Sequence, residues 1–389
     1  MKLFKSLLVA PAALGLLSPL SVSASEVNLN EISNYSDVES KKFANSFSND
    51  DSNNPLLAGG EGLVDGPSYD GGFSETTTAA FTVEGMLGST DDDDNTVDDA
   101  VAAGYSFQID LNTSFTGEDS LDISLDAGTG GTEGIAEFDG NGNGNGLTVD
   151  GVAYTFPIGD KTTAFVGADS DGSSLFTTAC VYGGPGNMLD DCANVNAGFT
   201  GGTTALGASY DFGSGFTAAF GAQTDNTSVF TEESGDAWAL NAAYTADNYA
   251  ISVTYGVVEA DNGANPPVLT DEENKFTAVN AYYTPDAEGF PSISVGYEFG
   301  DIGGAAAGAD EQASFMVGLT WDEVGPGSAG VAVGHSNTNE NADELYQYEA
   351  YYEYPVNDSM TVTPLIYTLD AAGNADDTTG MMVKISFSF

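Results

Sequence analysis

The chain has 389 residues, enough for two ordinary domains or one large barrel, and its charge is strongly one-sided. Acidic residues number 59 against seven basic residues, all of them lysine, for a formal net charge of -52. Because binding to nucleic-acid phosphates depends on lysine and arginine, this balance excludes a nucleic-acid-binding function. A solvated acidic surface that keeps the protein soluble in salty surroundings is an equally good interpretation of much of the acidity.

The chain begins MKLFKSLLVAPAALGLLSPLSVSAS, with two lysines, an apolar run from Leu7 to Leu20 and small residues around Ala24. This pattern is typical of a secretory signal peptide over residues 1–24, removed after Ala24. No later stretch approaches the roughly 18 consecutive apolar residues that a membrane-spanning helix needs. The sequence therefore predicts an exported protein without a helical span.

Residues 25–75 are polar, rich in Ser, Asn and Asp, and lack hydrophobic periodicity. We expect a flexible N-terminal segment there. From residue 76 to residue 389 short alternating runs follow one another, without a convincing amphipathic helix. These runs predict a single all-β domain over 76–389.

The clearest pair of strands lies in GYSFQIDLNTSFTGEDSLDISLDAG. Apolar and polar residues alternate on both sides of the turn TGED, which indicates a β-hairpin. The same pattern predicts sixteen strands in all. They are expected near 79–87, 104–115, 120–126, 147–156, 162–168, 203–212, 215–222, 237–245, 249–257, 275–284, 291–299, 312–321, 329–335, 345–354, 359–367 and 380–389.

The connections between these strands alternate between short and long. The short ones include GSG, ADN and PVND, whereas the long ones are acidic and rich in Gly and Asn. Short turns at one end, longer loops at the other and an even strand number are typical of a transmembrane antiparallel β-barrel. Aromatic residues also recur near strand ends, as an interfacial girdle requires. They include Phe115, Phe156, Phe212, Trp321 and Tyr354.

The chain ends MMVKISFSF, with apolar Met381, Val383, Ile385, Phe387 and Phe389 on one strand face. In a barrel this strand must pair with the first one, and its apolar face meets lipid. Lys384 then lies on the opposite, water-filled side, where a salt bridge to Glu84 of the first strand is possible.

The same alternation places a set of acidic side chains on the lumen wall, because a charged side chain facing lipid is costly. Carboxylates around a pore favour cations, so we expect a cation-preferring, water-filled diffusion channel. The alternative is that these groups are merely solvated and the pore is nearly unselective. The predicted pore-lining residues are Glu84, Asp110, Asp122, Asp126, Glu298, Glu349, Glu353 and Lys384.

Several strings resemble the barrel of cyanobacterial outer-membrane porins, relatives of the carbohydrate-selective porin family. They are NTSFTGEDSLDISLDAG, VAYTFPIGDKTTAFVG, ASFMVGLTWDE with AGVAVGH, and YQYEAYYEYPVNDSMTVTPLIY. The resemblance implies a homotrimeric porin in outer-membrane lipid for passive passage of small hydrophilic solutes. Residues 25–75 are too short and polar for the S-layer-homology domain common in that family. The terminal Phe389 resembles the signal read by the barrel-assembly machinery.

The loop near residues 169–202 is the third and longest of the long connections and contains CVYGGPGNMLDDC. In an exported protein Cys180 and Cys192 are expected to form a disulfide. In general porins the third outer loop folds into the barrel, and this loop resembles that arrangement, with Asp190 and Asp191 at the constriction. A disulfide-braced surface loop is the alternative.

Other functions have little support in the sequence. The sole histidine, His335, has no serine motif beside it, so no enzyme and no cofactor are predicted. No calcium-loop motif accompanies acidic clusters such as Asp91–Asp94, so no metal site is predicted either. The alternatives are a secreted acidic β-sandwich acting as an adhesin or binding protein, and a non-conducting surface barrel.

Overall fold

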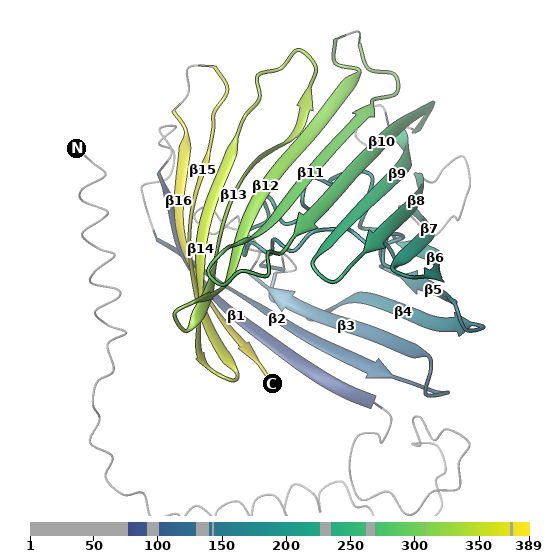
Figure 1. Cartoon of the computed structure of the whole chain (residues 1–389), viewed down its shortest axis with the longest axis horizontal. Helices are drawn as coiled ribbons and strands as arrows, with labels where there is room; N and C mark the ends of the chain where they lie inside the picture. Colours follow the sequence, from purple (N-terminus) through teal and green to yellow (C-terminus); the bar gives the residue numbers. More distant parts are fainter. Residues whose placement is uncertain are drawn as a thin grey trace, which may run out of the picture. The chain divides into compact units, whose positions relative to one another are not determined.

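The computed structural model describes residues 77–91, 101–129, 140–141, 144–225, 235–261, 269–306, 308–373 and 376–389. The expected signal peptide and the polar segment 25–75 lie outside the described residues. Within them sixteen strands form one closed antiparallel barrel, each paired with its neighbours in chain order and β1 with β16 (Figure 1). The predicted all-β barrel is therefore confirmed. In the same ranges no helix is long and apolar enough to cross a membrane.

The sixteen strands follow the predicted runs closely. The widest departure is β10, which begins at Leu269 although apolar alternation starts only near residue 275. The strands are β1 Thr77–Asp91, β2 Ala102–Thr113, β3 Ser120–Gly128, β4 Thr148–Ile158, β5 Thr162–Ala168, β6 Thr204–Gly213, β7 Phe216–Thr224, β8 Asp236–Thr245, β9 Tyr249–Asp261, β10 Leu269–Tyr283, β11 Ser292–Asp301, β12 Glu311–Val324, β13 Gly327–Asn339, β14 Gln347–Asn357, β15 Met360–Leu369 and β16 Thr378–Ser388.

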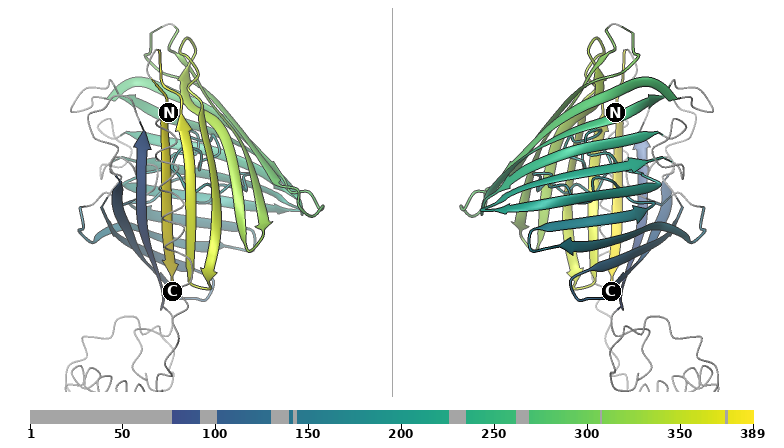
Figure 2. Two further views of the ribbon diagram at one scale, coloured as in Figure 1. Left: turned by 90° about the vertical axis from the view of Figure 1, so that its left-hand side faces the viewer. Right: turned by 90° about the vertical axis from the view of Figure 1, so that its right-hand side faces the viewer.

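Short and long connections lie at opposite ends of the barrel (Figure 2). At one end β6 and β7 are joined by residues 214–215 and β14 and β15 by residues 358–359. At the other end residues 169–203 join β5 to β6. The predicted alternation is confirmed, and it defines a short-turn end and a long-loop end.

The turn between β2 and β3 explains the hydroxyl residues and the aspartate in the string NTSFTGEDS. The carboxylate of Asp119, buried at 7 % exposure, accepts five hydrogen bonds and so fixes the whole turn. The donors are Ser114 Oγ, Phe115 N, Thr116 N, Thr116 Oγ1 and, from β4, Tyr154 OH, at 2.7–3.0 Å.

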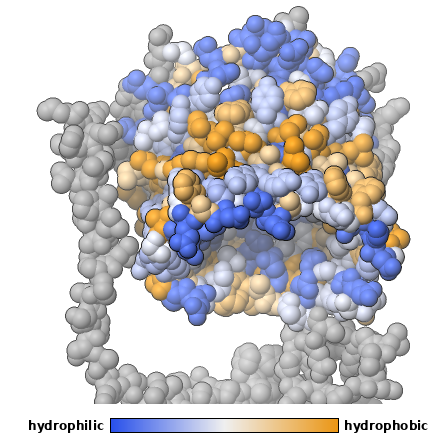
Figure 3. Space-filling model, in the orientation of Figure 1, coloured by the Kyte–Doolittle hydropathy of each residue, from blue (hydrophilic) through white to orange (hydrophobic). Residues whose placement is uncertain are grey.

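The two faces of the wall differ sharply in chemistry, as β11 shows. Ile293, Val295 and Tyr297 point outward and are 39–47 % exposed, whereas Ser294 and Glu298 point inward and are 1 % exposed. Figure 3 shows apolar residues (orange) gathered across the middle of the wall and hydrophilic residues (blue) towards its edges. A polar interior with an apolar outer band is the arrangement of a barrel that faces lipid.

Aromatic residues lie on the outer face near both ends of many strands. Near the short turns the rings of Phe216 and Tyr244 lie 4.6 Å apart. Near the long loops the rings of Trp238 and Tyr255 lie 6.0 Å apart. Such rings suit the two interfaces of a membrane, where one side is apolar and the other wet.

The barrel closes where the chain ends. The amide of Phe81 donates to the carbonyl oxygen of Phe389 at 3.0 Å, and the amide of Phe389 donates back at 3.1 Å. The two rings also stack, with their centroids 5.5 Å apart. The apolar terminus is thus held by the first strand.

Candidate pore and its constriction loop

Residues 169–203, here called the inner loop, run through the inside of the barrel (Figure 1). Backbone N–H groups of the loop donate to polar side chains on the inner faces of successive strands. A surface loop would not reach these faces, so the loop narrows the lumen. The pairs are Gly172 N to Gln223 Oε1 of β7 at 2.9 Å, Thr177 N to Asn241 Oδ1 of β8 at 3.0 Å, Ala179 N to Ser252 Oγ of β9 at 2.9 Å, and Val181 N and Tyr182 N to Ser294 Oγ of β11 at 3.0 and 3.1 Å.

Small inward residues on these strands make room for the loop. Ala239 and Ala278 are completely buried beneath it. A methyl group on Gly296 would overlap the carbonyl oxygen of Cys192. The inner faces of β7 to β12 are therefore shaped to receive the inner loop.

A disulfide joins Cys180 and Cys192, whose Cα atoms lie 6.5 Å apart. It ties the outgoing limb of the inner loop to its returning limb. The amide nitrogen Nδ2 of Asn280 on β10 donates to the Cys192 carbonyl at 2.7 Å, so the bridge is also held against the wall.

The middle of the loop adds an apolar contact with the wall. Leu189 is 1 % exposed and belongs to one cluster with Met316 of β12. The ring of Tyr182 lies 5.9 Å from that of Tyr351 on β14. The loop is thus fixed by packing as well as by hydrogen bonds.

Two predicted pore-lining acids lie beneath the inner loop instead of facing open water. Glu298 of β11 is 1 % exposed and Glu349 of β14 is 4 % exposed. Glu298 accepts hydrogen bonds from Asn196 and Ala197, and Glu349 accepts one from the hydroxyl of Tyr182. The expectation that these two carboxylates line the water-filled pore is therefore wrong, because the loop covers them. Sequence alternation gives the face of a residue but not what covers that face.

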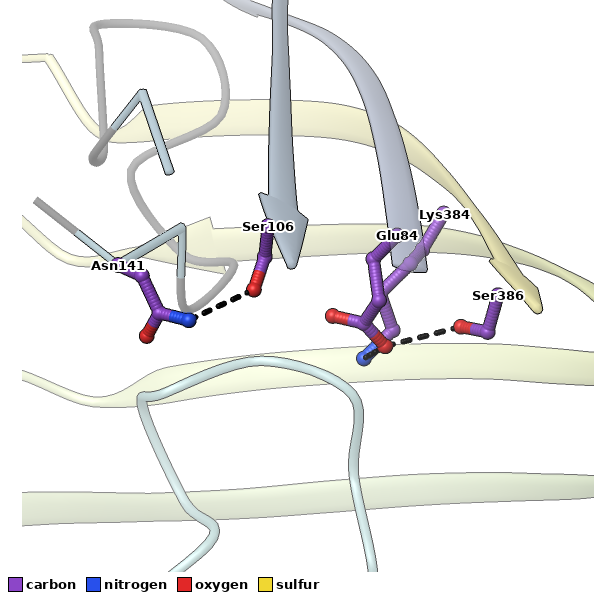
Figure 4. Close-up of polar contacts among 5 residues, drawn as sticks. All are labelled: Glu84, Ser106, Asn141, Lys384 and Ser386. Carbon is purple, nitrogen blue, oxygen red and sulfur yellow. Dashed lines mark hydrogen bonds and ion pairs between the residues drawn. The ribbon is translucent and has the colours of Figure 1, made fainter. Parts of the chain in front are cut away.

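The inner faces of β16 and β1 to β4 form a part of the wall that the loop leaves open, here called the open wall. Four of the predicted acids lie on it: Glu84, Asp110, Asp122 and Asp126. Lys384 Nζ lies 3.2 Å from Glu84 Oε1, and Ser386 Oγ donates to the same oxygen at 2.9 Å (Figure 4). Glu84 and Lys384 border a cavity of about 290 Å³, to which Asp110 and Asn141 also contribute. A positive charge thus lies among acids and hydroxyls on this wall.

Neighbouring polar groups hold the wall carboxylates in place. Ser124 Oγ donates to Asp110 Oδ1 at 2.7 Å, and Thr148 Oγ1 donates to Asp126 Oδ1 at 2.8 Å. Ser120 Oγ donates to Asp122 Oδ2 at 2.7 Å. Each of these carboxylates is thus oriented by a hydroxyl donor on a neighbouring residue.

A larger cavity of about 450 Å³ lies between the open wall and the inner loop. Asp122 borders it together with three acids that sequence analysis did not single out, Asp150, Asp169 and Asp171. Asp169 and Asp171 begin the longest loop, so the ADSDG string was the signal available. Asp150 had no clear signal, because a β-bulge opposite Ser124 breaks the alternation of β4.

The remaining predicted residues are spread out. Glu353 is exposed on β14, where Ser328 Oγ lies 3.4 Å from its Oε2. Asp190 is exposed on the inner loop and Asp191 is half-buried there, and neither borders the two cavities just described. Burial raises the pKa of Asp191 to about 6, and the negative charges of Asp190 and Glu298 act in the same direction.

No group of three or more His, Cys, Asp or Glu side chains in the described ranges is arranged to hold a metal ion. The acidic string Asp91–Asp94 lies mostly outside those ranges. His335 is 6 % exposed and lies between Phe315 and Tyr346, with ring centroids 6.2 and 5.6 Å away. Its surroundings are those of a packed strand residue.

A closed sixteen-stranded barrel with a lumen-filling loop defines the class: the fold is that of the bacterial porins. The structure is similar to a high-pH structure of Pseudomonas putida OprB, with a TM-score of 0.59, 13 % identity and coverage of 81 % of this chain and 94 % of that one. It is also similar to a mutant of the Rh. blastica porin (TM-score 0.53, 14 % identity, 80 % and 100 % coverage). A third similar structure is OmpT of Vibrio cholerae without its loop L8, an outer membrane protein (TM-score 0.53, 13 % identity, 81 % and 100 % coverage).

By sequence, no model of a known protein family matches the chain, and no curated protein matches it. The likeness to these structures therefore establishes the fold, and the apolar exterior agrees with a barrel that spans a membrane.

Proposed function

We propose that this protein is an outer-membrane porin, which forms a water-filled channel for passive diffusion of small hydrophilic solutes. The observation that carries the proposal is the division of the lumen: the inner loop fills one side, and polar cavities remain along the open wall. An apolar exterior with aromatic residues at both ends suits the lipid of an outer membrane. A catalytic function has no comparable support, and the sole histidine, His335, borders neither cavity.

We further propose that the channel prefers cations. On the open wall Glu84 and Asp110 border one cavity, and Asp122 borders the other together with Asp169 and Asp171 of the inner loop. Asp126 lies on the same wall at 8 % exposure. Lys384 is the one lysine among the residues that border the two cavities. Since carboxylates around a pore attract cations and repel anions, a net negative passage favours cations.

The test is the reversal potential of the purified protein in a planar bilayer across a potassium chloride gradient. We expect the sign of a cation-preferring pore, and a weaker preference at 1 M salt, where the screening length falls to about 3 Å. A potential near zero, or one of anion sign, would contradict the cation preference. Absence of conductance would contradict the channel itself and favour a non-conducting surface barrel.

We also propose a homotrimer. The outer faces of β1, β4 and β5 carry exposed aliphatic side chains near the long-loop end, whereas β8, β9 and β11 carry exposed aromatic ones, such as Trp238, Tyr255 and Tyr297. Leu87, Val149 and Val166 there are 50–52 % exposed, which is the kind of surface a second copy can cover. Cross-linking in detergent that gives only monomers would contradict this arrangement.

Export through the signal peptide and recognition of Phe389 by the barrel-assembly machinery remain predictions, as do the cyanobacterial family and passage of carbohydrates. Deletion of Phe389 tests whether the barrel-assembly machinery recognises this residue. We expect less assembled, heat-modifiable barrel in the outer membrane, and an unchanged amount would contradict the role.

A further inference from the structure

The returning limb of the inner loop is held by one buried carboxylate. Glu298 projects inward from β11 and is 1 % exposed. Its Oε2 accepts the backbone N–H of Asn196 at 2.9 Å and that of Ala197 at 2.7 Å. Its Oε1 accepts Asn196 Nδ2 at 2.7 Å. One side chain therefore satisfies two consecutive amides and a side-chain amide of the loop.

These contacts differ in kind from those of the outgoing backbone. Backbone N–H groups of the outgoing limb donate to neutral groups, such as Asn241 on β8 and Ser252 on β9, and its contact with a carboxylate, from Tyr182 to Glu349, is made by a side-chain hydroxyl. Hydrogen bonds to an ionised acceptor are roughly twice as strong as neutral ones. Glu298 accepts hydrogen bonds from two consecutive backbone amides of the inner loop.

The position of Glu298 on the far side from the open wall matters for its role. Asn196 Nδ2 also donates to Asn337 Oδ1 of the β13 strand at 2.7 Å, so the returning limb bridges two places on the loop-covered wall. Holding this part of the loop against the loop-covered wall keeps Asn196 and Ala197 out of the cavity that Asp122 borders. The width of the passage then depends on a residue that no solute touches.

We propose that Glu298 is the positioning residue of the pore, which sets the aperture by holding the returning limb of the inner loop against β11. This inference rests on the proposed channel function. It assigns Glu298 a role other than direct contact with ions, and it predicts that neutralising this carboxylate changes the geometry of the passage and not only its charge.

The test compares Glu298→Gln with Glu353→Gln in planar bilayers. Both variants remove one inward carboxylate, but Glu353 is exposed and accepts a hydrogen bond from Ser328 of the wall. In Glu298→Gln the new side-chain amide carries an N–H group that cannot accept the hydrogen bonds donated by the backbone N–H groups of Asn196 and Ala197. Part of the contact between the returning limb and β11 is therefore lost. We expect the fraction of molecules whose returning limb is detached from β11 to rise about tenfold, which corresponds to a loss of about 1.4 kcal/mol in the free energy of loop docking.

The readouts are open-channel current noise and the size limit for neutral polyethylene glycols, which report geometry and not charge. We expect Glu298→Gln to increase the noise and change the size limit, and Glu353→Gln to leave both as in the wild type. If Glu298→Gln fails to assemble, Asn196→Ala removes the same side-chain contact from the loop and should change the same two readouts.

The outcomes separate the two proposals. A wild-type protein that does not conduct contradicts the proposed function. A conducting wild type in which Glu298→Gln, or Asn196→Ala in its place, behaves like Glu353→Gln contradicts the positioning role alone.

Discussion

The two sides of the lumen are built from the same alternating strands but from different inward residues. On the loop-covered wall many inward positions are small or neutral, as with Ala239, Ser252 and Gly296, and the acids Glu298 and Glu349 there are hydrogen-bonded to the loop. On the open wall they are charged and longer, as with Asp122 and Lys384. The backbone of a barrel is nearly symmetric, so the size and charge of inward side chains decide which side the loop occupies.

The comparison also explains how one fold tolerates a large excess of acid. Glu84, Asp110 and Asp122 on the open wall border cavities, where a carboxylate costs little free energy. Asp126, at 8 % exposure, accepts a hydrogen bond from Thr148. A buried carboxylate costs several kcal/mol unless it is well hydrogen-bonded. Glu298 meets that condition through its three donor groups on the loop.

The largest effect is expected from filling the space that the loop needs. Gly296→Ala would place a methyl group against the Cys192 carbonyl, so either the loop or β11 must move. Overpacking of this kind costs about 1–3 kcal/mol. We expect a lower melting temperature and a changed single-channel conductance.

Gly85→Ala on β1 is the matched control for this substitution. A Cβ atom at Gly85 would meet nothing within 4 Å, so stability and conductance should both stay close to those of the wild type. If Gly296→Ala and Gly85→Ala have the same melting temperature and conductance, the Cys192 carbonyl does not pack against Gly296 as the structure describes.

A smaller effect is expected from titrating the inner loop at Asp191. Burial raises the pKa of this carboxyl from its ordinary 3.8 to about 6, against the hydrogen bond from Ala193 N, and Asp190 and Glu298 add to the increase. A raised pKa means that docking of the loop is favoured below pH 4 and that this contribution is lost as the pH rises through about 6. The docked loop should therefore be firmer in mild acid.

Asp191→Asn removes this titration. We expect wild-type open-channel noise to rise between pH 4 and pH 7, and the variant to show a flatter profile with less noise at pH 7. Asp190→Asn, at the exposed neighbouring position, is the control for a simple loss of charge. A wild-type profile that falls over this range would contradict the assigned sign.

Much of this fold was predictable because strand alternation and turn residues are local signals. The hairpin from Tyr105 to Leu125 carries both, and its register pairs Ile109 with Leu125 as the pattern implies. The length of the third long connection and its two cysteines also pointed to the constriction loop. These features require no knowledge of which strands lie opposite each other.

The division of the lumen was not predictable in the same way. Glu298 and Asp122 have the same pattern in sequence, an acid between outward apolar residues, yet one lies under the loop and the other beside a cavity. The difference depends on where the loop returns, which is a property of the whole barrel. Asp150 was missed for a local reason, since one extra residue in β4 reverses its face.

The smallest effect on stability is expected at the charge pair of the open wall. Glu84 and Lys384 have side chains 18 % and 21 % exposed, and Glu84 keeps its hydrogen bond from Ser386 when the lysine is replaced. Pairs near water contribute up to about 1 kcal/mol, so Lys384→Gln should change the melting temperature little. Its effect should appear in selectivity, because the passage loses a positive charge and Glu84 becomes uncompensated.

We expect the reversal potential of Lys384→Gln to shift towards stronger cation preference in a salt gradient. Lys161→Gln removes the same charge from the short turn between β4 and β5, away from the two cavities, and should leave the potential unchanged. If both variants shift the potential equally, the field at the pore comes from the total charge of the protein and not from the open wall. A shift by Lys384→Gln alone would show that the side of the lumen left free by the loop is the side that ions follow.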